Sequence, residues 1–356
     1  MKQGKTLVEL AKDVQRKAMA KEDYIANTRD LEIIPSEAGS GVDNVQLRVN
    51  GHGTLPLNNN SHGQIATYTK IPRKYYDIMR TDAPQLLAEN VNHWFQEKNG
   101  NRMVRTMDGT ARAFLSDRYR ILDNQEVLES VLPVLHDLGT PINIASMEIT
   151  ESRMYLKCTF PMVKAEVKKG EPIEAGFCLG NSEIGAGALN VWPFLHFLAC
   201  TNGMISKASG MSKYHIGRAM GQGKDAELFF KDDTLLADDR AFLLKLRDTL
   251  RASADEAHFR MLIDKMGTSR EKVVVGDPVE AVKVVQKKYS MNDEERVSVL
   301  THLIKGGELN QWGIINAVTR TAEDLESYDR ATEFESFGGK ILDLSPSEWK
   351  EVAHAA

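Results

Sequence analysis

Residues 176–224 read GFCLGNSEIGAGALNVWPFLHFLACTNGMISKASGMSKYHIGRAMGQGK, and the stretch changes character halfway along. Its first part is almost uncharged and rich in Gly, Trp, Phe and Leu, which predicts a buried position. We expect a strand, a glycine-bearing turn, a second strand and then an apolar run that enters a helix. The second part, from Asn202 to Lys224, contains four Lys or Arg residues and no acidic residue, although the net charge of the chain is -5.

Glycines recur through this basic part, and cationic side chains alternate with them. Because glycine weakens regular structure and permits close backbone approach, we expect a mobile loop that closes over a polyanion. Its contacting residues are predicted to be Lys207, Lys213, Tyr214 and Arg218. A tyrosine beside cations suits single-stranded nucleic acid, where base stacking and phosphate neutralisation share the binding. The alternative is an ordinary exposed loop.

Residues 101–122, upstream of this stretch, have the pattern of a β-hairpin. Asp108-Gly109 is a strong signal for a two-residue turn. That turn predicts Arg105 opposite Arg112, and like charges facing each other across two strands are destabilising. A phosphate between them would relieve the repulsion, and Arg118 and Arg120 would extend the positive strip. The alternative is that these arginines point into water or meet carboxylates elsewhere.

The order of elements predicts an α+β fold with an antiparallel sheet core and a helical C-terminal region. The hairpin at 101–122 is followed by a helix from Asn124 and then by two strands within 142–168, rather than by a βαβ repeat. From 226 onward the pattern is amphipathic and helical. We divide the chain into an N-terminal α/β segment (1–100), a central α+β core with the basic loop (101–225) and a helical region (226–356).

The N-terminal segment is predicted to contain short strands and helices. We expect a helix at 5–23, strands at 31–35 and 45–49, a helix capped by Ser61, and helices beginning near Pro72 and Pro84, the last with Trp94 on its apolar face. A second basic and aromatic group surrounds Pro72. It could touch a nucleic-acid backbone or be a solvated helix end, and it comprises Lys70, Arg73, Lys74, Tyr75 and Tyr76.

Composition excludes several classes of protein. The N-terminus lacks the apolar segment of a signal peptide, and no apolar run reaches the roughly 20 residues of a membrane span. The three cysteines form no CxxC pair and indicate reduced thiols in a cytoplasmic protein. No Cys/His set has metal-ligand spacing, and Gly180, Gly185 and Gly187 are not followed by the Lys-Ser/Thr of a P-loop. We therefore expect neither a metal nor another cofactor.

Four blocks occur in an order that resembles a known family. They are HGQIATYTKIPRKYYDIMRTDAPQLLAENVNHWF (62–95), RYRILDNQEVLESVLPVL (118–135), GNSEIGAGALNVWPFLHFLACTNGMI (180–205) and LNQWGIINAVTRTAEDLESYDRATEFESFGGKIL (309–342). The chain resembles, over roughly 60–345, the phage- and plasmid-borne family called domain of unknown function 932. This resemblance implies a mobile genetic element in a bacterial cell, where single-stranded DNA is often handled. The layout of hairpin, helix and sheet is also similar to that of ring-forming single-strand annealing proteins, without a shared motif.

The leading hypothesis is a non-enzymatic, cytoplasmic protein that binds single-stranded DNA, promotes annealing and assembles into a homo-oligomeric ring or filament. Two alternatives belong to other classes. A nuclease would need clustered carboxylates for Mg²⁺, and the candidates are Asp232, Asp233, Asp238 and Asp239. A protein-interaction module acting against a host factor would suit the acidic net charge and the helical C-terminal half.

Overall fold

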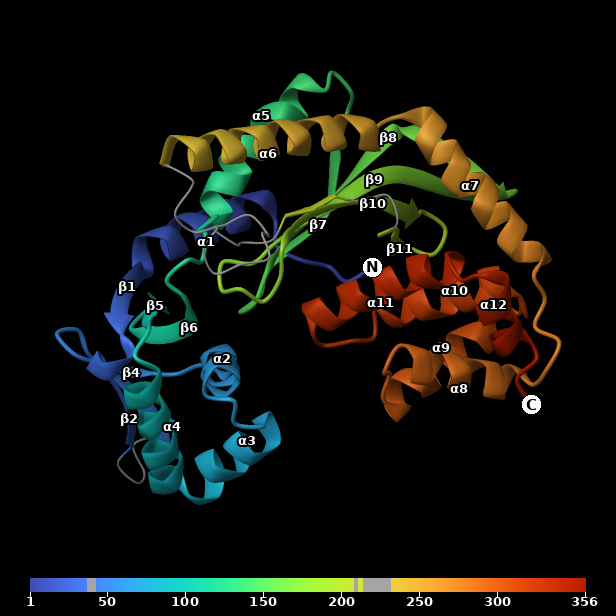
Figure 1. The fold of residues 1–356 in the computed structure, drawn as a ribbon. Coiled ribbons are helices and arrows are strands. Elements are labelled where there is room, and N and C mark those ends of the chain that lie inside the picture. The colour runs from blue at the N-terminus through green and yellow to red at the C-terminus, as the bar shows by residue number, and fades with distance from the viewer. Residues whose placement is uncertain (37–42, 208–210, 214–231) are drawn as a thin grey trace.

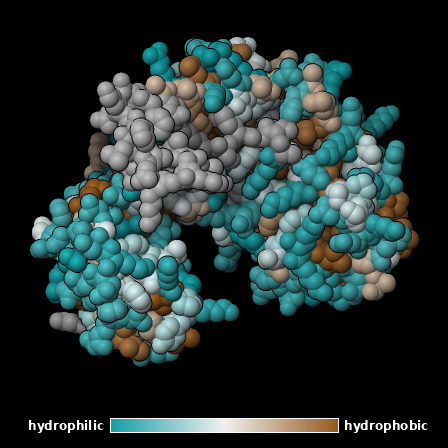
Figure 2. Space-filling view, in the orientation of Figure 1, coloured by the Kyte–Doolittle hydropathy of each residue, from teal (hydrophilic) through white to brown (hydrophobic). Residues whose placement is uncertain are grey.

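The computed structural model describes residues 1–36, 43–207, 211–213 and 232–356. These residues form antiparallel sheets with helices packed around them, so the predicted α+β class is confirmed. Figure 1 shows an N-terminal lobe on one side, a central sheet covered by helices, and a C-terminal group of helices on the other side. Figure 2 shows an open notch between the N-terminal lobe and the C-terminal helices.

The N-terminal lobe contains two three-stranded antiparallel sheets. One sheet has the order β1-β5-β6 and the other β2-β3-β4. The strands are β1 (Lys21–Asn27), β2 (Leu31–Pro35), β3 (Val45–Val49), β4 (Gly53–Pro56), β5 (Asn101–Met107) and β6 (Thr110–Ser116), and the short 3₁₀ turn η1 spans Thr28–Asp30. The helices are α2 (Asn59–Thr69), α3 (Arg73–Asp82) and α4 (Pro84–Lys98). Their apolar faces and both sheets share one core that extends from Leu31 to Phe114, across the predicted boundary at residue 100.

The central sheet is built from β7 (Asn143–Ile149), β8 (Met154–Lys168), β9 (Glu171–Asn181), β10 (Leu189–Phe197), β11 (Asn202–Ile205) and β12 (Met211–Lys213). The strand order is β11-β10-β9-β8-β7, and β12 also pairs with β10. Helices cover the sheet on both faces (Figure 1). This double coverage explains why β9 and β10 are buried along nearly their whole length and show no polar alternation.

Pro193 occupies the middle of β10, where a missing N–H would normally break the ladder. On one side it lies opposite Phe177 of β9. On the other side β11 pairs with β10 from Phe194 onward, whereas β12 pairs with it only up to Val191. Pro193 therefore lies at the junction between two partner strands, and its carbonyl accepts a hydrogen bond from the Ser206 N–H (2.9 Å).

The helices outside the N-terminal lobe are α1 (Leu7–Ala20), α5 (Asn124–Asp137), α6 (Asp232–Ser253), α7 (Glu256–Glu271), α8 (Pro278–Lys288), α9 (Asp293–Gly306), α10 (Gln311–Thr321), α11 (Tyr328–Leu342) and α12 (Pro346–Ala353). Helix α11 lies against β11 through two buried glycines. A Cβ at Gly339 would overlap the Ile205 carbonyl oxygen, and a Cβ at Gly338 would overlap Thr319 of α10. The glycines therefore allow a close contact between helix and strand.

Several predicted boundaries are wrong. The helix expected over 5–23 ends at Ala20, and the chain continues as β1. Asn58, not Ser61, caps α2, because its side chain accepts from the Ser61 N–H. The apolar run after Trp192 is strand β10 rather than the start of a helix.

The two largest hydrophobic clusters are separate, and a small cluster of Met103, Ala113, Leu115 and Ile184 spans the lobe hairpin and the segment after β9. The larger cluster joins the central sheet to α1, α5 and the C-terminal helices, and it shares no member with the lobe core. Within the described residues, no helix has the length and apolar character needed to cross a membrane.

Candidate functional site

The hairpin formed by β5 and β6 has the predicted turn, but a β-bulge changes its register. Met107 pairs with Thr110 and Thr106 with Ala111, after which Arg105 faces Ala113 rather than Arg112. Arg112 is the extra residue of the bulge, so the predicted Arg105–Arg112 pair is wrong. The cause is the one additional residue in β6, which two-residue turn geometry alone does not reveal.

Arg105 is completely buried and binds protein groups on all sides. Its Nε and Nη2 donate to both carboxylate oxygens of Asp23 on β1 (2.8 and 3.0 Å), and Nη2 also donates to Asp123 (2.9 Å). Its Nη1 donates to the carbonyl oxygen of Glu183 (2.6 Å). The phosphate-binding role predicted for Arg105 is therefore incompatible with this geometry, and the residue instead joins three segments of the chain.

The electrostatics agree with a structural role for this cluster. Burial alone would lower the pKa of Arg105, but the hydrogen bonds to Asp23 and the charges of both aspartates outweigh it and raise that pKa. Burial likewise opposes ionisation of Asp123, yet Arg105 and Lys21 hold its pKa below the usual value. Arg105 and Asp123 therefore stay charged near neutral pH.

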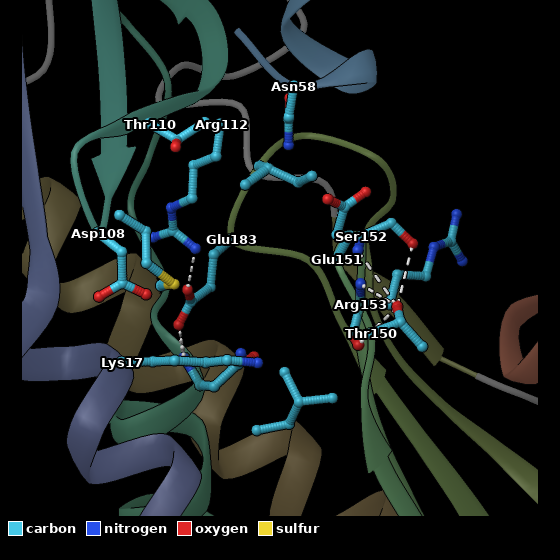
Figure 3. A pocket seen from close by; sticks show the side chains of 14 residues that line it. Lys17, Asn58, Asp108, Thr110, Arg112, Thr150, Glu151, Ser152, Arg153 and Glu183 are labelled. Carbon is cyan, nitrogen blue, oxygen red and sulfur yellow. Dashed lines mark hydrogen bonds and ion pairs between the residues drawn. The ribbon is translucent and has the colours of Figure 1, made fainter. Parts of the chain in front are cut away.

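Arg112 lines a cavity of about 430 Å³ between the N-terminal lobe and the edge of the central sheet (Figure 3). Its Nη1 donates to Oε2 of Glu183 (2.7 Å), and the other oxygen of that carboxylate accepts from the Asn124 N–H at the start of α5 (2.8 Å). Lys17 lies at the same wall, and Arg153 lies across the cavity. Arg112 is thus the only one of the eight predicted site residues that lines this cavity in the described part of the chain.

The other predicted residues lie elsewhere. Arg118 is exposed and Arg120 half-buried, both in the segment after β6. Lys207 is exposed beyond β11, with its Nζ 4.7 Å from the Trp192 ring centroid. Lys213 pairs through its backbone with Leu189 at the edge of β10. Tyr214, Arg218 and the rest of the predicted loop lie outside the described residues.

A different group of residues combines exposed aromatic rings with cations. Tyr75 on α3 and Trp94 on α4 are 48% and 38% exposed, and in the described residues they are the only Phe, Tyr or Trp side chains among the exposed large apolar groups. Both line a shallow hollow of about 570 Å³ on the N-terminal lobe. Lys70 and Lys98 contribute the two cations, and we call these four residues the aromatic platform.

The lysine of α4 is held directly over the aromatic rings. Lys98 Nζ lies 5.7 Å from the Trp94 ring centroid and 4.8 Å from the Tyr68 centroid, and it donates to the Tyr68 carbonyl oxygen. Burial, followed by the charges of Lys70 and Arg102, lowers the pKa of Lys98. The positive charges of Lys70 and Arg102 therefore repel the Lys98 ammonium. An anion bound beside these cations would relieve the repulsion.

Sequence reasoning finds part of this platform. Lys70 and Tyr75 belong to the basic and aromatic group around Pro72, whereas Tyr76 of the same group is fully buried. The predicted inward position of Trp94 is wrong, because Trp94 is exposed while Phe95 takes the buried position. The helical period places Trp94 at the edge of the apolar stripe, and the packing of α4 against β2, Tyr68 and Phe114 covers Phe95 instead.

No group of His, Cys, Asp or Glu within the described ranges could hold a metal ion. The four aspartates considered for a nuclease lie in α6, in a part whose side chains are not described. Comparison of the chain with protein-family models, with curated proteins and with solved structures finds no match.

Proposed function

We propose that this protein binds single-stranded DNA through the aromatic platform of Lys70, Tyr75, Trp94 and Lys98. The observation that carries the proposal is the pairing of two exposed aromatic rings with two lysines around one hollow. Bases of any sequence stack on aromatic side chains, and lysines neutralise the adjoining phosphates. The hollow is shallow and open, as a strand that passes across the surface requires.

The choice of DNA as the nucleic acid rests on the resemblance to a family of mobile genetic elements. Strand annealing and assembly into a ring or filament are further parts of the proposal that rest on the same resemblance and layout. The hairpin arginines Arg105 and Arg112 have no place in the interface, because carboxylates of the chain already hold them. Arg118, Arg120 and Lys207 remain candidates for contacts with the strand beyond the platform.

Fluorescence anisotropy with a labelled oligothymidine strand of about 16 nucleotides tests the proposal. We expect binding that weakens steeply between about 50 and about 200 mM salt, because phosphate neutralisation releases counterions. Trp94→Ala and Tyr75→Ala should each weaken binding by about tenfold, which corresponds to the loss of one stacked base. Ile304→Ala serves as the matched control, since Ile304 is 68% exposed on α9 and lies outside the hollow.

The lysines give a second readout. Lys98→Gln should reduce the slope of log K against log salt by about 0.7, the value for one phosphate contact on a single strand. Lys70 adopts a left-handed backbone conformation (φ 60°), so Lys70→Asn is the suitable variant. Absence of binding at low salt, or equal affinity of the Trp94, Tyr75 and Ile304 variants, would contradict the proposal. Metal-dependent loss of the DNA would favour the nuclease hypothesis instead.

A further inference from the structure

Strand β1 lies at the edge of the β1-β5-β6 sheet, with β5 on one side only. At one end of the pair the Asp108 N–H donates to the Ala20 carbonyl oxygen (3.3 Å). At the other end the Thr28 N–H donates to the Gly100 carbonyl oxygen (3.0 Å), and the register between the two bonds is unbroken. Because alternate residues of an antiparallel strand bond to the same neighbour, the even-numbered residues of β1 direct their backbone groups toward β5. The odd-numbered residues direct theirs outward.

The outward-facing residues of β1 are Lys21, Asp23, Ile25 and Asn27. None of their backbone N–H and carbonyl groups has a hydrogen-bond partner in the described part of the chain. Among the described elements only β5 packs extensively against β1, and Figure 1 shows β1 at the outer margin of the lobe. Ile25 is 56% exposed. A row of free donors and acceptors of this kind is a template for one more strand.

Other edges of the lobe are closed by side chains. On β2, the Asn92 side chain accepts from the Ile33 N–H (2.7 Å) and donates to the Ile33 carbonyl oxygen (2.9 Å). On β6, the Gln64 side chain of α2 accepts from the Phe114 N–H (2.6 Å). Proteins commonly protect their edge strands from further pairing by such coverage. Within the described residues, β1 has no equivalent protection along its outer side.

We propose that β1 is the contact surface for a second copy of this chain, whose own β1 pairs with it in antiparallel orientation. The two lobe sheets then form one continuous sheet across a two-fold axis, with the same surface used on both copies. The inference does not rest on DNA binding. It names a surface for self-association, and because a two-fold contact closes at two copies, a ring or filament would need a further surface.

The sequence of β1 is compatible with pairing to itself. Hydrogen bonds form only where outward-facing residues meet, so odd-numbered residues must lie opposite odd-numbered residues. The register that pairs all seven residues of the strand places Asp23 opposite Ile25 of the partner subunit and Lys21 opposite Asn27 of the partner subunit. No like charges face each other there, whereas a shift that placed Asp23 opposite the partner's Asp23 would be destabilising. Ile25 also gains the partner's Ile25 as a diagonal neighbour, which covers two exposed apolar side chains.

Sedimentation velocity of the full chain from about 1 to about 300 µM tests the proposal, since an interface this small should give a weak, concentration-dependent dimer. Ile25→Pro removes an outward N–H and leaves the bonds to β5 in place, so it should weaken dimerisation by at least about tenfold. Ile25→Asp adds a carboxylate at the contact and should also weaken it, and it serves as the test if Ile25→Pro does not fold. Ile304→Asp, at a position 68% exposed on α9, is the matched control.

Disulfide formation tests the register. Tyr24 lies opposite the partner's Tyr24 in a pair without hydrogen bonds, where the two Cα atoms are about 4.5 Å apart and within disulfide range. With Cys200 replaced by Ser, Tyr24→Cys should give a covalent dimer on mild oxidation, whereas Glu22→Cys on the same face of the strand should not.

The proposal is overturned if the chain stays monomeric at the highest concentration, if both Ile25 variants dimerise like the original protein, or if the two cysteine variants cross-link equally. Trp94→Ala removes a ring of the aromatic platform and should leave dimerisation unchanged. Oligothymidine binding by Ile25→Asp should likewise equal that of the original protein at concentrations where both are monomers. Failure of the dimer and failure of DNA binding can therefore be told apart.

Discussion

Arg105 is the residue whose removal should damage the fold most directly. It is fully buried and neutralises Asp23 and Asp123. Arg105→Ala leaves Asp23 without its cation and Asp123 with Lys21 alone, and removal of one partner from a buried ion pair costs about 3–5 kcal/mol. Urea denaturation followed by circular dichroism measures the loss of stability.

An exposed arginine provides the comparison for this prediction. Arg260 is exposed on α7 and pairs with Glu256 one helical turn away (2.6 Å). Such surface pairs contribute less than about 1 kcal/mol, so Arg260→Ala should be nearly neutral. Equal stability of the Arg105 and Arg260 variants would refute the structural role assigned to Arg105.

His62 gives the protein a specific sensitivity to acid. It is fully buried in α2, its Nδ1 lies 2.9 Å from the Tyr76 hydroxyl and its Nε2 lies 2.5 Å from Asp43. Burial lowers its pKa to about 4 despite the opposing charge of Asp43. The folded protein then resists protonation that the unfolded chain accepts near its ordinary pKa of 6.5.

The sign of the pH dependence follows from this lowered pKa. Stability from neutral His62 is fully present above pH 6.5 and is lost as the pH falls toward 4, by up to roughly 3 kcal/mol. Urea midpoints measured across this range should fall more steeply for the original protein than for His62→Gln. Parallel pH profiles for the two proteins would exclude His62 as the source.

The residues of the candidate site can be predicted only where the signal is local. Tyr75 and Lys70 stand out because aromatic and basic residues lie close together in the sequence. The burial of Arg105 has no such signal, since its partner Asp23 lies 82 positions away and is the last residue of the helix predicted over 5–23, although it belongs to strand β1. The bulge at Arg112 has no local sequence signature, and neither does the orientation of Trp94.

At the scale of elements, the contact between α11 and β11 depends on glycine. A methyl group at Gly339 would overlap the carbonyl oxygen of Ile205, which is backbone and cannot rotate away. Although alanine is the better helix former, Gly339→Ala should destabilise the protein by about 1–3 kcal/mol through overpacking.

The same substitution in another helix should have the opposite effect. Gly267 lies inside α7, and a methyl group added there would have no neighbouring atom within 4 Å. Gly267→Ala should therefore stabilise the protein by up to about 1 kcal/mol. Thermal denaturation of both variants tests the pair, and a stabilising Gly339→Ala would show that α11 does not lie this close to the sheet.

Helix starts and turns can be predicted from the sequence where neighbouring residues determine them through capping or turn geometry. An Asp-Pro pair is a sequence signal for a helix start, and α8 begins at Asp277 and Pro278. Asn292 and Glu295 have capping-box spacing in the sequence, and they form the capping box of α9. The Asp108-Gly109 turn also lies where predicted. The sequence pattern assigns part of β10 to a helix because a continuous apolar run has no period, and burial on both faces removes the alternation that would identify a strand.

At the scale of the whole molecule, two separate hydrophobic cores predict unfolding in more than one step. The lobe core and the larger core share no residue, and the described ion pairs Arg105–Asp123 and Arg112–Glu183 link the lobe hairpin to the segments beside the central sheet. In the described residues these ion pairs are joined there only by a small apolar cluster of Met103, Ala113, Leu115 and Ile184, which is a weaker junction than a continuous core. Differential scanning calorimetry should therefore give a measured enthalpy larger than the van't Hoff enthalpy.

A variant at the junction sharpens this prediction. Glu183→Gln removes the charge that holds Arg112, and it should separate the two transitions further by lowering the temperature of one of them. A single transition with equal enthalpies in both proteins would indicate that the lobe and the sheet unfold as one unit.

Because two of the three cysteines are buried, the third can be labelled selectively in the folded protein. Cys158 and Cys178 are inaccessible between the sheet and its covering helices, and burial raises the pKa of the Cys178 thiol to about 12. Cys200, in the turn between β10 and β11, is only partly covered. A maleimide dye should thus attach at one position in the folded protein and at three after denaturation, so a reporter can be placed next to the β10–β11 turn without any mutation.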